Sequence, residues 1–329
     1  MNLLYPWLKK YFKKIKKKYI NNKLHHAILF QTQKGLGINN LIKKIIQLIF
    51  CNNIKNNICK ICNGCKYNIY NHPDLIHFKK KNKKKKINID DIRMIKERIY
   101  TTPHQNGNKI IWLNNSKKIT ENANNALLKI LEEPPKNTYF IIKNNHFNIL
   151  KNTLKSRFLI FYIKNPSEKN SLKWFLKKKN NHLYKKYLIC LRTNYGSPLS
   201  AKKFLNNNLW NLRKYFFKNI NICIKKKNFL NLIYFLNEKY IFHQINWLIN
   251  IFLDCIKYKF KIYNNIINID KKKIIIEINK KYNINIINKF ISIFMKLKKY
   301  LYFTPGINFE LILIKQLIKL NNISLYKNY

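Results

Sequence analysis

The segment His25–Phe50 constrains the fold of this chain more than any other stretch. His25–Phe30 (HHAILF) is a short apolar run typical of a buried strand, and Gln31–Asn40 (QTQKGLGINN) follows as a turn with two glycines. Leu41–Phe50 then repeats apolar residues at helical spacing. A strand, a glycine-bearing turn and a helix in this order predict an α/β domain with a parallel sheet.

The glycine turn has the spacing of a phosphate-binding loop but lacks the residues that perform its chemistry. A working loop, G-x-x-x-x-G-K-[ST], places a lysine on the β- and γ-phosphates and a hydroxyl on magnesium. Gly35 and Gly37 keep the tight turn, but Thr32 stands at the first glycine position. The lysine position holds Ile38, and the hydroxyl position holds Asn39. We expect a degenerate loop without ATP hydrolysis; the alternative is that this segment never was a nucleotide site.

A predicted central strand also ends in residues that do not suit nucleotide hydrolysis. Lys109–Leu113 (KIIWL) is an apolar run typical of a central parallel strand. In P-loop nucleotidases such a strand ends in acidic residues that hold magnesium and polarise water. Here it ends in Asn114 and Asn115. An amide cannot act as a general base at neutral pH, so this second loss agrees with the first.

Four of the seven cysteines lie at a spacing typical of a metal site. They are Cys51, Cys59, Cys62 and Cys65, in the pattern C-x7-C-x2-C-x2-C. Two cysteines separated by two residues can turn both sulfurs onto one ion, and four thiolates complete the tetrahedral shell of a structural Zn2+. A pair of disulfides or a redox C-x-x-C are the alternatives, and the lack of a secretory signal argues against disulfides.

The formal net charge of +53 has two explanations. Lys and Arg together number 66, but only five of these residues are Arg, and Asn, Ile and Lys crowd the whole sequence. Codons for these three residues can consist almost wholly of A and T, so a strongly AT-biased genome would produce this composition without selection. The functional alternative is attraction to nucleic acid, because clustered lysines neutralise phosphates and release counterions. The spread of lysines over the whole chain favours the AT-biased origin.

The first twenty residues, Met1–Ile20, predict a basic amphipathic helix whose apolar residues fall on one face. Such a helix can lie on a membrane, but docking on its own domain is the commoner arrangement. No apolar run is long enough to span a membrane, and this segment lacks the uninterrupted apolar core of a signal peptide. We therefore expect a cytoplasmic protein without membrane contact.

The chain divides into an α/β part and an all-helical part. The candidate strands of the first part are Ala27–Phe30, Leu75–Phe78, Ile110–Leu113, Tyr139–Ile142 and Leu159–Tyr162. The long helix-periodic stretches of the second part are Trp210–Ile220, Phe229–Leu236, Ile241–Tyr258, Ile284–Leu301 and Phe309–Leu320. The sequence predicts a parallel-sheet domain over residues 1–164, a small helical unit over 165–206 and a helical domain over 207–329.

The ordered set of motifs resembles the delta-prime family of bacterial DNA polymerase III clamp-loader subunits, nearly from end to end. Tyr5-Pro6-Trp7-Leu8 opens the match, and His25-His26-Ala27 leads into the degenerate loop. The four cysteines follow with the zinc-site spacing of the family. Asn125–Pro135 (NALLKILEEPP) is close to a clamp-loader signature, and Leu154-Lys155-Ser156-Arg157 stands where these proteins carry a Ser-Arg-Cys motif.

The resemblance implies an AAA+ (RecA-like) core with a zinc-binding insertion, a helical lid and a helical collar for oligomerisation. It implies a pentameric ring in which motor (gamma/tau) subunits and a delta subunit load the sliding clamp onto primer–template DNA. The delta-prime member is implied to be ATP-inert and to offer Arg157, with Ser156, to the ATP site of a neighbour. A guanidinium on the γ-phosphate stabilises transition-state charge. Phe158 replaces the cysteine of the motif, and this departure puts the placement of Arg157 in question.

Two other functions stay open from the sequence. One is an active AAA+ ATPase, the motor subunit of the same complex, against which Ile38, Asn39, Asn114 and Asn115 argue. The other is a zinc-containing basic module that binds nucleic acid tightly without partners. Such a module would not need the helical C-terminal part, which argues against this alternative. The leading expectation is a non-catalytic subunit of the DNA polymerase III holoenzyme, without enzyme activity of its own.

Overall fold

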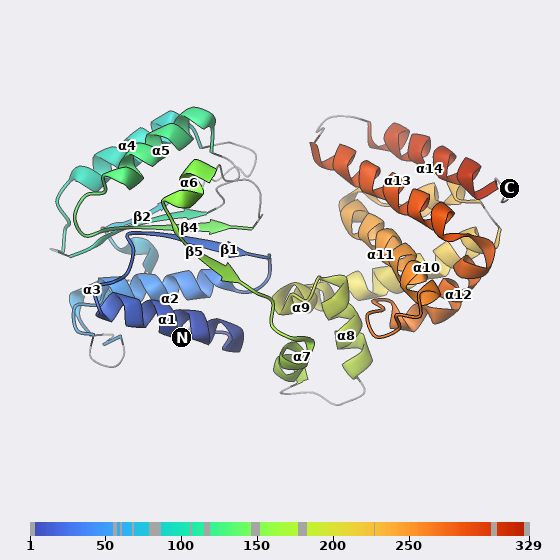
Figure 1. The fold of residues 1–329 in the computed structure, drawn as a ribbon, viewed down its shortest axis with the longest axis horizontal. Helices are drawn as coiled ribbons and strands as arrows, with labels where there is room; N and C mark the ends of the chain where they lie inside the picture. The colour runs from blue at the N-terminus through green and yellow to red at the C-terminus, as the bar shows by residue number, and fades with distance from the viewer. Residues whose placement is uncertain are drawn as a thin grey trace. The chain divides into compact units, whose positions relative to one another are not determined.

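The computed structural model describes residues 4–54, 58–59, 61–67, 69–78, 87–105, 107–114, 119–145, 152–176, 183–226, 228–303 and 308–325. Asn115, which follows the predicted strand Lys109–Leu113, lies outside these residues. The chain folds as two compact units, Met1–Pro166 and Ser167–Tyr329 (Figure 1).

A five-stranded parallel sheet forms the centre of the first unit. Its strands are β1 Ala27–Thr32, β2 Leu75–Phe78, β3 Lys109–Asn114, β4 Thr138–Asn144 and β5 Leu159–Ile163. They lie in the order β2-β3-β4-β1-β5, and every paired neighbour runs parallel. All six residues of β1 are buried, because strands covered on both faces read as continuous apolar runs. The five strands predicted from the sequence are confirmed, each to within two residues at either end.

Helices cover both faces of this sheet (Figure 1). On one face lie η1 Pro6–Leu8, α1 Lys9–Ile20 and α2 Ile38–Phe50. On the other lie α4 Ile89–Tyr100, α5 Glu121–Glu132 and α6 Asn152–Ser156. Each face has its own buried apolar cluster, and Leu8 and Ile15 are fully buried in the first of them. The predicted docking of the first helix on its own domain is therefore confirmed.

Capping chemistry sets the ends of α4 and α5. Asn88 and Asp91 form a reciprocal capping box at the start of α4. The hydroxyl of Thr120 accepts a hydrogen bond from the backbone N–H of Ala123 at the start of α5. Pro134 and Pro135 follow closely on the last residue of α5, since proline cannot continue a helix.

The second unit is helical throughout its described residues and has one continuous apolar core (Figure 1). Its α-helices are α7 Glu168–Leu176, α8 Tyr184–Thr193, α9 Pro198–Asn206, α10 Leu209–Lys225, α11 Ile241–Lys259, α12 Lys272–Lys281, α13 Ile284–Phe303 and α14 Phe309–Leu325. The 3-10 helices are η5 Leu230–Phe235, η6 Glu238–Tyr240 and η7 Ile269–Lys271. None of the helices among the described residues is both long and apolar enough to cross a membrane. The boundary near residue 206 stays a prediction.

A buried polar network fixes the segment between α11 and α12. The Arg213 side chain is fully buried and donates hydrogen bonds of 2.9 Å to each carboxylate oxygen of Asp270 and one of 2.7 Å to the Asn268 side chain. Its guanidinium carbon lies 5.3 Å from the ring centroid of Trp210. Asp254, also fully buried, accepts from the backbone N–H and the side-chain amide of Asn268. These bonds satisfy charges that would be costly to bury alone.

Candidate functional site

The four cysteines predicted as metal ligands come together at the end of α2. Their sulfur atoms all lie within 4.8 Å of one another, and all four thiols are free of disulfides. Cys51 follows the last residue of α2, Cys62 caps the short helix α3 (Asn63–Lys66), and Cys65 lies within α3. The Cys51–Cys59 and Cys59–Cys65 sulfur distances are 3.6 Å and 3.9 Å.

These sulfur–sulfur distances fit tetrahedral coordination of one metal ion by the four cysteines. With Zn–S bonds of about 2.3 Å, the edges of a tetrahedral four-sulfur shell are about 3.8 Å long. The backbone N–H of Cys59 donates to the sulfur of Cys51, and the N–H of Cys62 donates to the sulfur of Cys59, both at 3.4 Å. Hydrogen bonds from backbone N–H groups lower the pKa of the Cys59 thiol to about 6. The cluster thus favours a thiolate at Cys59 and is compatible with zinc.

Gly64 is required by the close approach of α3 to α2. A Cβ atom added at Gly64 would lie 2.0 Å from the carbonyl oxygen of Phe50, the last residue of α2. The reason for this glycine is therefore close backbone packing beside Cys51. Any larger residue would push Cys65 away from the cluster. The ring of Phe50 also stacks on buried His72, with centroids 3.7 Å apart.

The loop predicted to be a degenerate phosphate loop contains two glycines in the left-handed backbone region. Gly35 and Gly37 both have positive φ angles, 82° and 79°, and Gly37 directly precedes α2. The indole N–H of Trp7 donates to the carbonyl of Leu36 at 2.9 Å, so η1 closes on this turn. Left-handed backbone favours glycine, which explains the residue type at both positions.

The residues at the lysine and hydroxyl positions of the loop, Ile38 and Asn39, make contacts within the protein itself. Ile38, at the lysine position, is 3% exposed and belongs to the apolar cluster around α2. Asn39, at the hydroxyl position, accepts a hydrogen bond of 2.8 Å from the ammonium group of Lys143, at the end of β4. Burial and the charge of Lys34 lower the pKa of Lys143. A cation of the chain itself thus lies beside the residue that replaces the metal ligand.

Asn114 ends β3 in the same sheet. Its side-chain amide lies 3.0 Å from Nε2 of His77 on β2, which is the neighbouring strand. The His77 ring in turn stacks on Trp112, with centroids 4.2 Å apart. The end of β3 therefore carries an amide fixed to an aromatic stack, where hydrolytic relatives of this fold carry a carboxylate.

Arg157 lies between α6 and β5, with its guanidinium at the surface. Its Nη2 donates to Oε1 of Glu132 at 2.7 Å, and the two side chains are 45% and 46% exposed. Its Nη1 donates to the hydroxyl of Ser156 at 3.2 Å. Phe158, in place of the motif cysteine, is 7% exposed within the cluster around α4 and α5. The large ring therefore fills the core and leaves Arg157 facing solvent.

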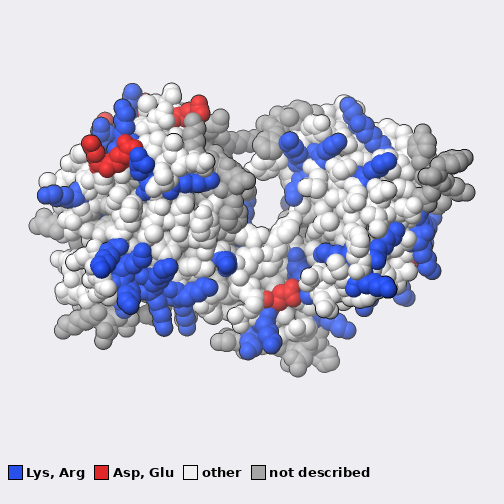
Figure 2. All heavy atoms as spheres, in the orientation of Figure 1, with Lys and Arg blue, Asp and Glu red and all other residues white. Residues whose placement is uncertain are grey.

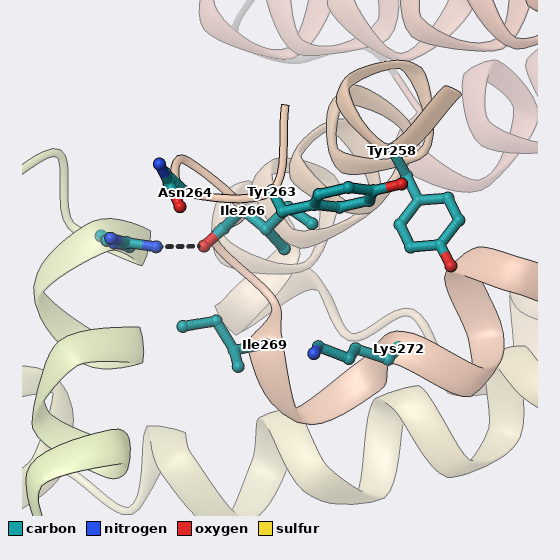
Figure 3. A pocket seen from close by; sticks show the side chains of 7 residues that line it. Tyr258, Tyr263, Asn264, Ile266, Ile269 and Lys272 are labelled. Atoms are coloured by element: carbon teal, nitrogen blue, oxygen red, sulfur yellow. Dashed lines mark hydrogen bonds between the residues drawn. The ribbon is translucent and has the colours of Figure 1, made fainter. Parts of the chain in front are cut away.

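The second unit contains a pocket of about 330 Å³ beside the segment that follows α11 (Figure 3). The residues that line it are Arg192, Tyr258, Tyr263, Asn264, Ile266, Ile269 and Lys272. Arg192 donates at 2.8 Å and 3.0 Å to the two carboxylate oxygens of Glu168 and at 2.5 Å to the carbonyl of Ile266. Each guanidinium nitrogen thus donates one hydrogen bond, so Arg192 holds this segment against α7 and α8 and has a structural role.

Sequence reasoning assigned no role at these sites to three side chains that the structure brings to them. They are Trp7 over the loop, Glu132 beside Arg157, and Lys143 beside Asn39. Glu132 lies within the signature NALLKILEEPP, which was a usable signal. Lys143 could be placed only from the strand order, because the ends of β4 and β1 are adjacent in the sheet.

Comparisons with known proteins now define the class of this chain. A family model described as DNA polymerase III, delta subunit, matches residues 7–167, and one described as DNA polymerase III, delta subunit, C terminal, matches residues 207–322. The crystal structure of a DNA polymerase III gamma subunit-related protein from Thermotoga maritima has a similar fold, with a TM-score of 0.50 and 17% identity over 95% of this chain and 99% of that chain. The fold is therefore shared with DNA polymerase III subunits, and a parallel-sheet unit is followed by a helical unit, as predicted.

Two curated relatives identify the family within this class. DNA polymerase III subunit delta-prime of Buchnera aphidicola subsp. Schizaphis graminum (strain Sg) is 41% identical over 317 residues, which are 95% of this chain and 96% of that protein. The Haemophilus influenzae subunit delta-prime is 30% identical over 97% of this chain and 98% of that protein. The chain belongs to the family of DNA polymerase III delta-prime subunits. The resemblance inferred from the motifs is thereby confirmed.

Proposed function

We propose that this chain is an ATP-inert delta-prime subunit that helps a DNA polymerase III clamp loader place the sliding clamp on primed DNA. It acts as one member of a pentameric ring with motor (gamma/tau) subunits and a delta subunit. Membership of the delta-prime family supports this role. The observation that carries the ATP-inert part is the Lys143–Asn39 hydrogen bond beside a buried Ile38.

The chemistry of the loop supports ATP inertness. In P-loop enzymes a lysine neutralises the β- and γ-phosphates, and the metal ion bridges them. Ile38 is buried and uncharged, so it supplies no cation. The Asn39 oxygen faces an ammonium group, which has one charge and cannot coordinate several oxygens as Mg2+ does. Asn114, the last residue of β3, offers an amide in place of a carboxylate, and an amide cannot act as a general base at neutral pH.

The surface position of Arg157 supports its action on a neighbouring ATP site. An exposed ion pair such as Arg157–Glu132 contributes only about 0.2–1 kcal/mol, so the guanidinium can leave Glu132 when a phosphate is offered. The planar fork of arginine matches phosphate oxygens, and stabilisation by such a group raises kcat by about 10³–10⁵. Ser156 positions the fork through its hydroxyl.

The cysteine cluster supports a structural Zn2+ as the cofactor of this chain. Cys51, Cys59, Cys62 and Cys65 would hold the ion and would thereby join the end of α2 to α3. Four thiolates leave no open coordination position, so the ion would contribute to folding and not to catalysis.

The test is ATP hydrolysis by the reconstituted clamp loader in the presence of primed DNA and the sliding clamp. This chain is supplied as wild type, omitted, or carrying Arg157→Ala or Arg157→Lys. Omission and Arg157→Ala should both lower hydrolysis, because the ATP site that faces Arg157 loses about 10³-fold or more in kcat. Arg157→Lys should recover little, since lysine lacks the fork.

Arg93→Ala is the matched control, because Arg93 is also an exposed arginine paired with one carboxylate, that of Asp90. It should leave hydrolysis unchanged. If omission lowers hydrolysis but Arg157→Ala does not, the assembly role stands and the role of Arg157 is wrong. Magnesium-dependent hydrolysis by the isolated chain would instead favour an active motor subunit.

A further inference from the structure

The helix α1 has two opposite faces of very different chemistry. Leu8 and Ile15 are fully buried against the sheet, and Tyr11, Phe12 and Tyr19 pack beside them. The other face carries exposed lysines at positions 9, 10, 13, 14 and 17. At about 100° per residue, these five lysines span an arc of about 140° centred opposite the buried face. We call this set the α1 lysine stripe.

Neither α1 nor α2 contains a carboxylate. The sequence contains no Asp or Glu before Asp74, so neither α1 nor the adjoining helix α2 supplies a counter-charge. Asp74 itself is buried and accepts hydrogen bonds from the backbone of His104 and Gln105. Figure 2 shows Lys and Arg atoms gathered over α1 in the lower part of the first unit. The density of lysines on α1 is therefore higher than an even distribution of lysines along the chain would give.

Helix α2 extends the same positive surface. The ammonium group of Lys44 lies 5.0 Å from the ring centroid of Phe12, which belongs to α1. Lys43, on the same helix, lies 4.6 Å from the centroid of the Tyr70 ring. Lys44 is thus held by an aromatic ring of α1 and Lys43 by the ring of Tyr70, and such contacts reduce the freedom of these long side chains.

The chemistry of the stripe favours a row of phosphates as its ligand. A membrane-bound helix inserts its apolar face into the lipid, but that face of α1 is buried in the protein core. Lysine is depleted from protein–protein interfaces, where aromatic anchors are enriched. The stripe extends for about 12 Å along the helix, and duplex DNA presents about one charge per 1.7 Å of its axis. About seven phosphate charges therefore lie within its length.

We propose that the α1 lysine stripe is a sequence-independent binding surface for the phosphate backbone of DNA. The surface belongs to this chain alone and does not require the ring, the zinc ion or the Arg157 contact. Lysine suits this role because its ammonium group acts as a point charge without demanding fork geometry.

The experiment is fluorescence anisotropy of a labelled duplex with the isolated full-length chain between 50 and 200 mM KCl. One variant carries Lys→Gln at positions 9, 10, 13, 14 and 17. The matched control carries Lys→Gln at five dispersed, exposed lysines of the second unit, at positions 185, 203, 273, 289 and 299. Both variants lose the same charge, and circular dichroism checks that both remain folded.

The stripe variant should bind at least about 100-fold more weakly at 50 mM salt, and its slope of log K against log salt should be shallower by about 4. The dispersed control should change that slope by less than about 1, and Lys→Arg at the five stripe positions should retain binding. Equal losses in the two Gln variants would overturn the proposal, because total charge alone would then explain the affinity. Unchanged DNA binding with failed assembly into the clamp loader would also overturn it, in favour of an acidic protein partner. The readout uses no ATP hydrolysis, so it is independent of the proposed motor contact.

Discussion

Two of the arginines of this chain, Arg192 and Arg213, are placed where a lysine could not replace them. Only five of the 66 basic residues are Arg, and Arg192 and Arg213 each donate two hydrogen bonds to a single carboxylate. A planar fork can form such parallel bonds, whereas an ammonium group cannot match their geometry. Because the composition of this chain favours lysine, the presence of arginine at position 157 agrees with a role that needs a planar guanidinium group.

Replacement of Arg213 by lysine should destabilise the second unit. Arg213→Lys keeps the charge but leaves at least one acceptor, on part-exposed Asp270 or on buried Asn268, without its donor, at a cost of about 1–3 kcal/mol. Urea denaturation followed by circular dichroism measures the loss. Arg93→Lys, on an exposed pair, should change the unfolding free energy by no more than about 0.5 kcal/mol. Equal effects of the two substitutions would contradict the assigned role of Arg213.

The Arg213–Asp270 pair should also make stability depend on acid pH. Burial alone would raise the pKa of Asp270, but the hydrogen bonds and charge of Arg213 outweigh it and hold that pKa below its usual 3.8. A carboxyl with a lowered folded-state pKa stabilises the fold above its unfolded-state pKa, and this contribution is lost as pH falls through the folded-state value. The difference in unfolding free energy between wild type and Asp270→Asn should therefore shrink below about pH 4. A difference that stays constant from pH 7 to pH 3 would exclude this linkage.

Among the structural elements, those that depend on local sequence patterns were predicted correctly from the sequence. The strands were recognised from apolar runs, and the cysteine cluster from spacing within one short segment. The segment Phe229–Leu236 has helical periodicity but forms the 3-10 helix η5, since periodicity alone does not distinguish the two at this length. Helix α12 was missed because lysines flank a short apolar run. The Lys143–Asn39 contact joins residues 104 positions apart, and only the strand order brings them together.

The short helix α3 should be sensitive to the size of residue 64. In Gly64→Ala the new methyl group would overlap the carbonyl of Phe50, which displaces α3 and the Cys65 ligand. We expect zinc affinity to fall by about 10–100-fold, as when residues that orient metal ligands are changed. Competition with a zinc chelator measures this affinity. Gly107→Ala is the control, because a Cβ there meets only an ordinary contact at 3.6 Å; a matching loss in that variant would show that the effect is not local.

At the scale of the whole molecule, each unit has its own buried core. The first unit has two apolar clusters on the faces of its sheet, and the second has one cluster that runs from Leu172 to Leu320. Segments with their own cores can fold alone. The continuous second core means that the predicted lid and collar share buried residues, although the sequence suggested a boundary near residue 206.

Fragments should reveal these cooperative units. Residues 1–166 and 167–329, expressed separately, should each unfold in one cooperative transition, because the cut between residues 166 and 167 divides none of the apolar clusters. A fragment of residues 207–329 should be less stable than residues 167–329, since it loses Leu172, Leu191 and Phe204 from the shared core. Thermal unfolding by calorimetry measures both. Equal stability of the two C-terminal fragments would instead favour an independent collar.

The Lys143 ammonium beside Asn39 has a consequence for how this chain responds to its surroundings. A dissociable ion occupies its site only as its concentration allows, whereas a group tethered to the chain has a fixed effective concentration. The surroundings of the loop should therefore not vary with the supply of magnesium or with the ratio of ATP to ADP. If the proposed ring of ATP-driven subunits is correct, the loop of this chain would keep one geometry while the conformations of its neighbours change with the supply of ATP.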